Sequence, residues 1–167
     1  DALFEAGGNQ QLTATNRVLD TTIPYAGDYG ISKNPESLAW DQYRLYFADR
    51  QRGAVLRLSR DGLTPISDVG MRTYFRENLK QCDSLVGTFD GVSGEYNLTL
   101  KYNESSSSTN KTVSFNEGSK GWVSFKSFVP TTGVTVAGKY LTTTSETNAF
   151  YSTEDAMYKV YEHYRDD

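Results

Sequence analysis

Alternating apolar and polar residues fall into three short runs in the first half of the chain. Tyr43–Ala48, Ala54–Ser59 and Leu63–Ser67 each have the composition and period of a β-strand. Two polar turns separate them, Asp49–Gly53 and Asp61–Gly62. An Asp-Gly pair between alternating runs is a strong hairpin signal, because glycine accepts the positive φ that tight turns demand. The pattern predicts a three-stranded antiparallel meander over these runs.

After the meander, the apolar residues recur with the period of a helix and no longer alternate with polar residues. Positions at i, i+3, i+4, i+7 and i+8 form one stripe: Met71, Tyr74, Phe75, Asn78 and Leu79. Asp68 is a suitable N-cap residue, so we expect one short helix to begin just after it. The opposite face mixes Arg and Lys with Glu, which favours docking on the edge of the sheet over membrane or partner binding.

A second strand-rich unit opens at Leu85. Leu85–Asp90 leads into a glycine-containing turn, and Glu95–Tyr102 alternates strictly, as a strand with one buried face should. Asn103–Asn110, with four consecutive serines, has the composition of a solvated loop. Further strands are expected at Lys111–Asn116, Trp122–Phe128, Val134–Val136 and Lys139–Thr143, with a last hairpin formed by Asn148–Tyr151 and Met157–Tyr161.

The two units share a spacing that indicates a repeat. An aspartate stands four residues before a glycine in each, Asp49 before Gly53 and Asp90 before Gly94. The units are roughly forty residues apart, the size of a four-stranded propeller blade. We therefore predict an all-β fold of β-propeller-blade-like antiparallel meanders with one short helix, forming a partial or incomplete propeller or an open, curved sheet.

Three segments follow from this pattern. Residues 1–22 are expected to be an irregular arm or an extension of a preceding domain. Residues 23–83 would hold the first blade-like unit and the short helix, and residues 84–167 the second and a partial third unit. The chain begins with Asp1 and not with Met, and its 167 residues suit one domain or part of a larger one, so we expect a piece of a longer protein.

Composition narrows the classes of function. Aromatic residues make up 13% of the chain, which suits a sheet-rich protein. The formal net charge of −4 argues against binding nucleic acid by neutralising phosphates. No apolar run approaches the roughly 20 residues of a membrane span. Cys82 is the one cysteine, so no disulfide can form within the chain, and we interpret it as a small, semi-buried thiol.

Candidate catalytic residues are sparse. His163 is the single histidine, which argues against a His-based triad or a His-rich metal site. The carboxylates in turns lack the spacing of a glycosidase pair or a calcium loop. The turn from Asp90 to Glu95 comes nearest, but capping of the turn by Asp90 explains it. We predict no enzyme activity, no cofactor, and no catalytic, cofactor-binding or metal-binding residues, and the sequence assigns no ligand-binding residues.

Aromatic residues near position 125 raise the alternative of a carbohydrate platform. Trp122 and Phe128 should share one face of a strand while Phe125 takes the other, so at least one face must be buried, and packing in the core is favoured. Asn-x-Ser/Thr sequons also begin at Asn97 and Asn103, and a third begins at Asn110. In a chain this rich in Ser and Thr, chance explains them.

Several long segments carry a resemblance to a known class of protein. They are Pro24–Ser37, Tyr46–Leu63, Thr112–Glu117 and Gly121–Pro130. Together they resemble large virion structural proteins of tailed phages, especially phages of marine cyanobacteria, including nozzle, muzzle and baseplate-associated proteins. The resemblance runs from about Ile23 to the C-terminus, and it is loosest in Tyr151–His163.

The resemblance implies a non-enzymatic structural component of a phage tail, made in the host cytoplasm and located in the virion. Its partners would be other copies of itself in a ring and neighbouring tail proteins. No catalytic residue comes with the resemblance. The alternative is a host-surface or glycan-binding module of a phage or a bacterial adhesin, with the loops around Ser105 and Trp122 in contact with glycan. A hydrolase is the weakest hypothesis, because the chain lacks a carboxylate pair.

Overall fold

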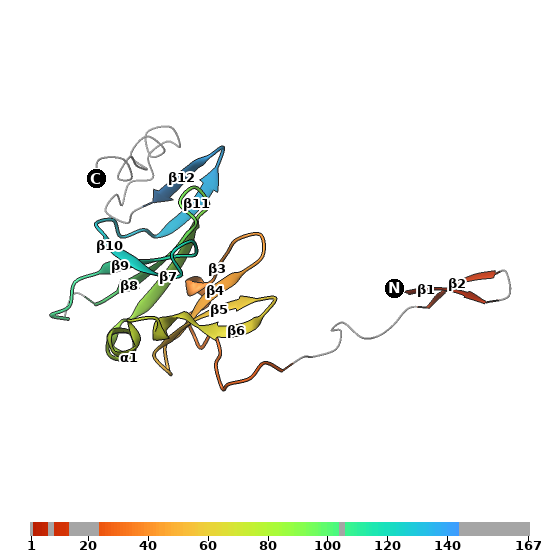
Figure 1. Cartoon of the computed structure of the whole chain (residues 1–167), viewed down its shortest axis with the longest axis horizontal. Helices are drawn as coiled ribbons and strands as arrows, with labels where there is room; N and C mark the ends of the chain where they lie inside the picture. Colours follow the sequence, from red (N-terminus) through yellow and green to blue (C-terminus); the bar gives the residue numbers. More distant parts are fainter. Residues whose placement is uncertain (1, 7–8, 14–23, 104–105, 144–167) are drawn as a thin grey trace.

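The fold is all-β with one α-helix in the part that the structure describes. The structure is a computed structural model, and it describes residues 2–6, 9–13, 24–103 and 106–143 (Figure 1). Two four-stranded antiparallel sheets have the orders β3-β4-β5-β6 and β10-β9-β8-β7. Neighbouring strands are therefore consecutive in the sequence, as in the blades of a propeller. The predicted fold class of blade-like antiparallel meanders with a short helix is confirmed.

The first sheet contains the predicted meander. Its strands are β3 (Ala39–Trp40), β4 (Leu45–Asp49), β5 (Ala54–Ser59) and β6 (Gly62–Pro65). The Asp-Gly turn joins β5 to β6, and Gly62 there has a φ of +95°, as the hairpin requires. The short strand β3, which the pattern did not predict, pairs with β4 and completes a four-stranded sheet.

Helix α1 (Arg72–Gln81) follows the first sheet, and it confirms the predicted helix. Phe75 and Leu79 on its apolar stripe are fully buried. The predicted cap is wrong, because Met71 and not Asp68 is the N-cap residue. Asp68 instead ends a 3-10 helix, Ile66–Asp68, and Gly70 with a φ of +73° separates the two helices. Asp68 meets the helix only through an exposed ion pair with Arg72 at 3.6 Å.

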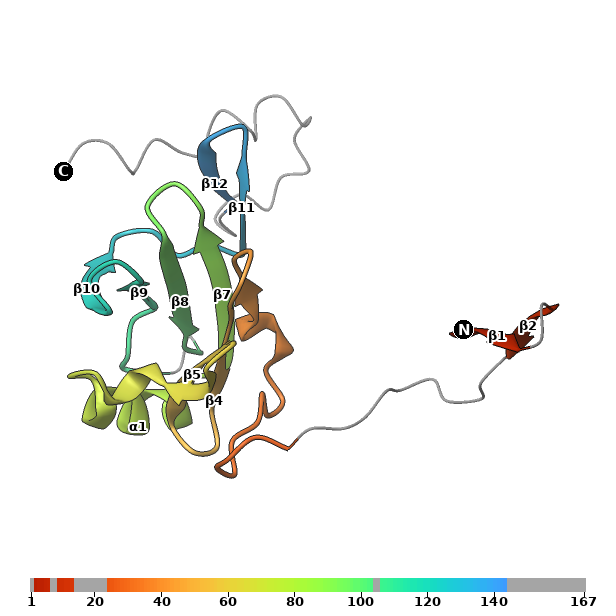
Figure 2. The same cartoon turned by 45° about the vertical axis from the view of Figure 1, so that its right-hand side comes forward.

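The second sheet has the strands β7 (Ser84–Asp90), β8 (Glu95–Lys101), β9 (Lys111–Asn116) and β10 (Gly121–Lys126), and it stands beside the first sheet (Figure 2). The alternation in β8 predicted one solvated face, but both faces are buried. Leu98 and its apolar neighbours face the core, whereas Asn97 and Thr99 lie on the opposite, polar face. The hydroxyl of Thr99 bonds that of Thr112, and Ser114 bonds Asn97, which makes burial of the polar face tolerable.

Two further hairpins lie outside the four-stranded sheets. One consists of β11 (Thr132–Val136) and β12 (Lys139–Thr143), and the other of β1 (Ala2–Ala6) and β2 (Asn9–Thr13). The hairpin of β1 and β2 is regular structure within the segment that was predicted to be an irregular arm or an extension of a preceding domain. Gly7 and Gly8, which separate the two strands in the sequence, are a hairpin signal that outweighs the weak periodicity. The hairpin predicted over 148–161 lies outside the described residues.

The core lies where the first sheet and α1 meet the apolar face of the second sheet. Tyr46 from β4 stacks between Phe89 of β7 and Tyr96 of β8, with ring centroids 5.6 and 5.0 Å away. The hydroxyl of Tyr96 donates to the backbone oxygen of Ser37 at 2.7 Å. A Cβ on Gly87 would lie 2.0 Å from that same oxygen, so only glycine allows this close approach of β7.

Candidate functional site: the junction between the sheets and the surfaces around it

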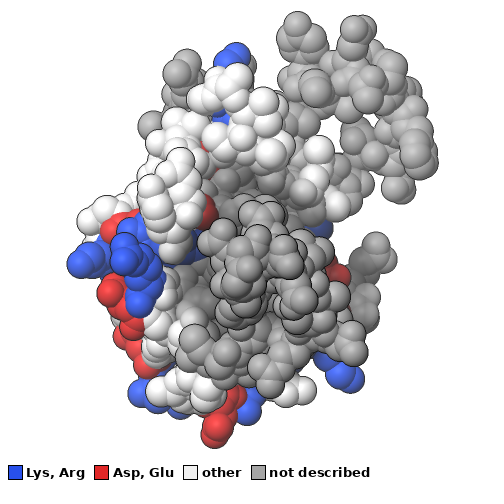
Figure 3. Space-filling view, turned by 90° about the vertical axis from the view of Figure 1, so that its right-hand side faces the viewer, with Lys and Arg blue, Asp and Glu red and all other residues white. Residues whose placement is uncertain are grey.

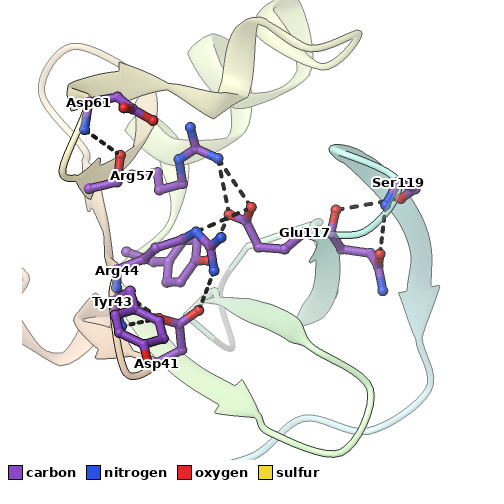
Figure 4. Close-up of polar contacts among 10 residues, drawn as sticks. Asp41, Tyr43, Arg44, Arg57, Asp61, Glu117 and Ser119 are labelled. Carbon is purple, nitrogen blue, oxygen red and sulfur yellow. Dashed lines mark hydrogen bonds and ion pairs between the residues drawn. The ribbon is translucent and has the colours of Figure 1, made fainter.

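A polar cluster joins the two sheets at the turn between β9 and β10. Glu117 in this turn accepts a hydrogen bond from the Tyr46 hydroxyl at 2.7 Å. Its carboxylate also accepts from Arg57 Nη1 at 3.1 Å and lies 3.5 Å from Arg44 Nε (Figure 4). Tyr46, Arg57 and Arg44 all come from the first sheet or its turns. One carboxylate of the second sheet thus binds three side chains of the first.

Asp41 fixes the arginine that reaches this cluster. Its Oδ1 accepts the backbone N–H groups of Tyr43 and Arg44, each at 2.7 Å, and its Oδ2 accepts Arg44 Nη1 at 2.9 Å. The amide of Asp41 donates to the backbone oxygen of Arg44 at 3.0 Å. These bonds close a rigid turn between β3 and β4 and aim the guanidinium of Arg44 at Glu117.

The charged groups of this cluster and the Tyr46 hydroxyl connect the two sheets. Burial, followed by the hydrogen bond to Glu117, raises the pKa of Tyr46 far above its ordinary value, so its hydroxyl stays a donor. The hydrogen bond that Arg44 donates to the Asp41 carboxylate raises the pKa of Arg44. Every charged group of the cluster therefore has a partner of opposite sign, and the Tyr46 hydroxyl beside the Glu117 carboxylate stays protonated because it is buried. This arrangement locks the sheets together and offers no chemistry of its own.

The repeated aspartates occupy equivalent places in the two sheets. Asp49 ends β4 and Asp90 ends β7, while Gly53 and Gly94 immediately precede β5 and β8 with φ values of +66° and +67°. Both aspartates are fully buried. Asp90 Oδ1 accepts the backbone N–H of Val92 at 2.8 Å, so the predicted capping of this turn is confirmed.

Asp49 has a further role in holding the segment before the first sheet. Its carboxylate accepts hydrogen bonds from the Ser32 hydroxyl at 2.8 Å and from the Gly30 amide at 3.0 Å, as well as from Arg52. Burial alone would raise the pKa of Asp49, but the hydrogen bonds from Ser32, Gly30 and Arg52 hold it below its ordinary value. The carboxylate is thus a buried anchor, not a reactive group.

Trp122, Phe125 and Phe128, the aromatic residues considered as a carbohydrate platform, do not form one exposed surface. A register shift between Trp122 and Ser124 puts Trp122 opposite Phe115 and Phe125 opposite Val113. Trp122 and Phe125 therefore share a face, which corrects the prediction that strict alternation places them on opposite faces. Both contact aromatic rings of α1, whereas Phe128 is buried against Tyr140.

Trp122 is partly buried and packs against the core, as the packing interpretation predicted. Its ring lies 4.5 Å from Phe75 and 5.3 Å from Phe115, measured between centroids. Its indole N–H donates to the backbone oxygen of Ile66 at 3.0 Å. These partners cover much of the ring, which is not one of the exposed aromatic side chains of the described residues. Asn97, the first residue of one sequon, is fully buried and bonded to Ser114, so it is no acceptor for a glycan in the folded chain.

The remaining candidates carry no reactive arrangement. Cys82 is fully buried, more deeply than expected, and burial raises the pKa of its thiol to about 11. Among the described residues, no group of three His, Cys, Asp or Glu side chains could hold a metal ion, and no helix could cross a membrane. His163 lies outside these residues.

On the face drawn in Figure 3, Lys and Arg side chains lie beside Asp and Glu side chains and form no separate basic stripe.

The alternation of apolar and polar residues did not indicate two exposed surfaces. One is the turn between β3 and β4, where Trp40 and Tyr43 are exposed, and the other is the outer face of the β11–β12 hairpin. Two aromatic residues flanking Asp41-Gln42 could have indicated the first, because Asp readily closes a turn over the next residues.

A comparison with models of known protein families gave no match, and neither did a comparison with curated proteins.

Proposed function

We propose that the chain is a non-enzymatic structural module of a tailed-phage virion, which packs against other copies of itself and neighbouring tail proteins. The observation that carries the proposal is the inverted pattern of the β11–β12 hairpin. Val134 and Val136 on β11 are 54% and 53% exposed, whereas Tyr140 and Thr142 on β12 are buried. The hairpin thus buries hydroxyls and exposes valines, the reverse of an ordinary surface hairpin.

Hydrogen bonds and close packing fix this orientation. The Tyr140 hydroxyl bonds Thr88, and the Thr135 hydroxyl accepts the amide of Gly91 at 2.9 Å. A Cβ on Gly133 would lie 3.0 Å from a side-chain atom of Thr88, so β11 approaches β7 closely at this glycine. Turning the valines inward would break these bonds, because a shift of one residue exchanges the two faces of a strand. The valines therefore stay outside.

The outward face suits contact with another protein. Val134 pairs with Leu141, which adds a third apolar side chain to this face, and Lys139 pairs with Val136 at its end. Val92, which is 59% exposed, follows the glycine whose amide binds Thr135. Protein interfaces have apolar, charge-poor centres, and covering such side chains stabilises by about 25 cal/mol per Å². The resemblance to virion structural proteins supports the setting in a phage tail.

Edge strand β10 supports the same proposal independently. Among the described residues it pairs only with β9, so its other edge is open. Val123 and Phe125 on this strand are 46% and 57% exposed. An open edge with exposed apolar residues is a template for a strand from another chain.

The test is sedimentation velocity on the protein with Val134→Lys, with Val69→Lys as the matched control. Val69 is 47% exposed but lies between the 3-10 helix and α1, away from the hairpin. We expect Val134→Lys to shift the protein from oligomer towards monomer with an unchanged circular dichroism spectrum, because a lysine ammonium would be buried in the interface. Val69→Lys should leave the oligomer intact. Equal self-association of the two variants would contradict the role of the hairpin.

A further inference from the structure

A shallow hollow at the turn between β3 and β4 has features of a ligand site. Its volume is about 390 Å³, within the range of small-molecule sites. Residues of two segments line it: Trp40, Asp41, Gln42, Tyr43, Arg44 and Leu45 from the turn, and Leu58, Ser59 and Arg60 from the end of β5. No residue of the β11–β12 hairpin lines this hollow, but Trp40 also borders a neighbouring hollow that Val134 of β11 lines.

Two exposed rings form the apolar part of the hollow. Trp40 is 65% exposed and Tyr43 is 72% exposed, although most aromatic side chains that the structure describes are buried or packed against the core. Exposed Trp and Tyr rings provide large contact areas at low cost in conformational entropy, because each side chain has only two rotatable bonds. Flat apolar faces of this kind match the C–H faces of sugar rings.

The turn that presents these rings is rigid. Asp41 accepts hydrogen bonds from the amides of Tyr43 and Arg44 and from the Arg44 guanidinium. Glu117 binds Arg44 from the second sheet at 3.5 Å. The backbone that carries Tyr43 is therefore held in place before any ligand arrives, which lowers the entropic cost of binding.

The polar groups of the hollow determine the class of ligand. The Asp41 carboxylate already accepts three hydrogen bonds and has little capacity left for sugar hydroxyls. The exposed guanidinium of Arg60 forms no hydrogen bond or ion pair within the described ranges, and Gln42 adds an exposed amide. Asp41, Arg44 and Arg60 together give the lining a charge of +1. A donor-rich lining of this kind matches a ligand rich in acceptors, above all a carboxylate.

From these features we infer that the hollow binds an acidic saccharide, with a sugar ring against Trp40 and Tyr43 and a carboxylate on Arg60. The site is distinct from the platform at Trp122, whose ring is partly buried and packs against the core. A protein is the other partner that this open, largely apolar lining could hold, and the experiment below distinguishes the two. In a tail component, such a site would contact acidic glycans of a cell surface.

The test is a titration of the protein with trigalacturonate as the acidic probe and with maltotriose as the neutral probe. Tryptophan fluorescence and calorimetry measure the binding. We expect saturable binding of trigalacturonate that weakens with added salt, and much weaker binding of maltotriose. Trp40→Ala should weaken binding about tenfold, as expected for loss of a central aromatic contact. Arg60→Gln should reduce the preference for the acidic probe. Tyr25→Ala, which removes a 50% exposed ring elsewhere, should change nothing.

The variant Tyr43→Ala keeps the test informative if Trp40→Ala disturbs β3, because the Tyr43 side chain lies outside the strands. Absence of saturation, equal binding of the two probes, or equal loss in Tyr25→Ala would overturn the inference. So would a Trp40→Ala protein that changes its sedimentation while the parent binds neither sugar, because the hollow would then be a protein contact.

Discussion

The hydroxyl of Tyr46 donates a 2.7 Å hydrogen bond to Glu117, a residue 71 positions further along the chain. Tyr46 belongs to the first sheet and Glu117 to a turn of the second, so this bond and the arginine contacts around it connect the two blade-like units. The connection is polar, but it lies directly beside the stacked rings of Tyr46 and Tyr96. The apolar core and the charge cluster therefore stabilise the same junction.

Removing the charge of Glu117 should destabilise the whole fold. Glu117→Gln leaves Arg57, whose side chain is only 18% exposed, without its carboxylate. We expect a loss of about 1–3 kcal/mol in the free energy of unfolding. Urea denaturation measures it as a lower midpoint with an unchanged slope. Glu77→Gln on the exposed face of α1 is the matched control and should stay within about 0.5 kcal/mol of the parent.

Because β7 approaches the backbone of Ser37 closely at Gly87, we predict that a larger residue at position 87 destabilises the fold. Gly87→Ala would place a Cβ 2.0 Å from the Ser37 oxygen, which also accepts the Tyr96 hydroxyl. The 3-10 helix Pro35–Ser37 would have to move away from β7, and we expect a loss of about 3 kcal/mol in the free energy of unfolding, the upper range for overpacking. Gly30→Ala meets nothing within 4 Å and serves as the control in thermal melts. Similar melting temperatures for the two variants would refute the tight contact.

Asp49 should make stability depend on pH. Hydrogen bonds hold its pKa in the folded protein below the unfolded value of about 3.9. The ionised carboxylate therefore stabilises the fold above that pH, and this contribution disappears as the pH falls through the folded pKa. We expect Asp49→Asn to unfold at lower urea concentration than the parent at pH 7, with the gap narrowing below about pH 4. A gap that stays constant down to pH 2 would be inconsistent with this role.

Cys82 should resist thiol reagents while the protein is folded. Burial raises its pKa to about 11, and only the thiolate is an effective nucleophile. At pH 8 we expect iodoacetamide to label the folded chain far more slowly than the chain in denaturant. Mass spectrometry reports this directly, because the chain has one cysteine. Equally fast labelling in both conditions would show that the site is open.

Local signals in the sequence predicted much of the fold. The meander from β4 to β6 follows from Asp61-Gly62 and the alternation on either side, and α1 follows from its stripe. Each of these signals spans only a few residues. The aspartate-glycine repeat also predicted correctly that Asp49 and Asp90 hold equivalent turns.

Features that depend on contacts between distant segments were not predictable in this way. The bulge after Trp122 changes which face Phe125 occupies, and nothing in the alternation indicates it. The polar face of β8 is buried because Asn97 and Thr99 find partners on other strands. Glu117 shows no local pattern, since its three partners come from the other sheet. The outer face of the β11–β12 hairpin was missed for the same reason, because its orientation depends on contacts with Thr88 and Gly91.

Sedimentation velocity of the unaltered protein over a wide range of concentration tests the proposed assembly most directly. If the exposed valines of β11 and the open edge of β10 are contact surfaces, the protein will form a discrete, ring-sized oligomer that persists on dilution. A stable monomer at high concentration would contradict the account.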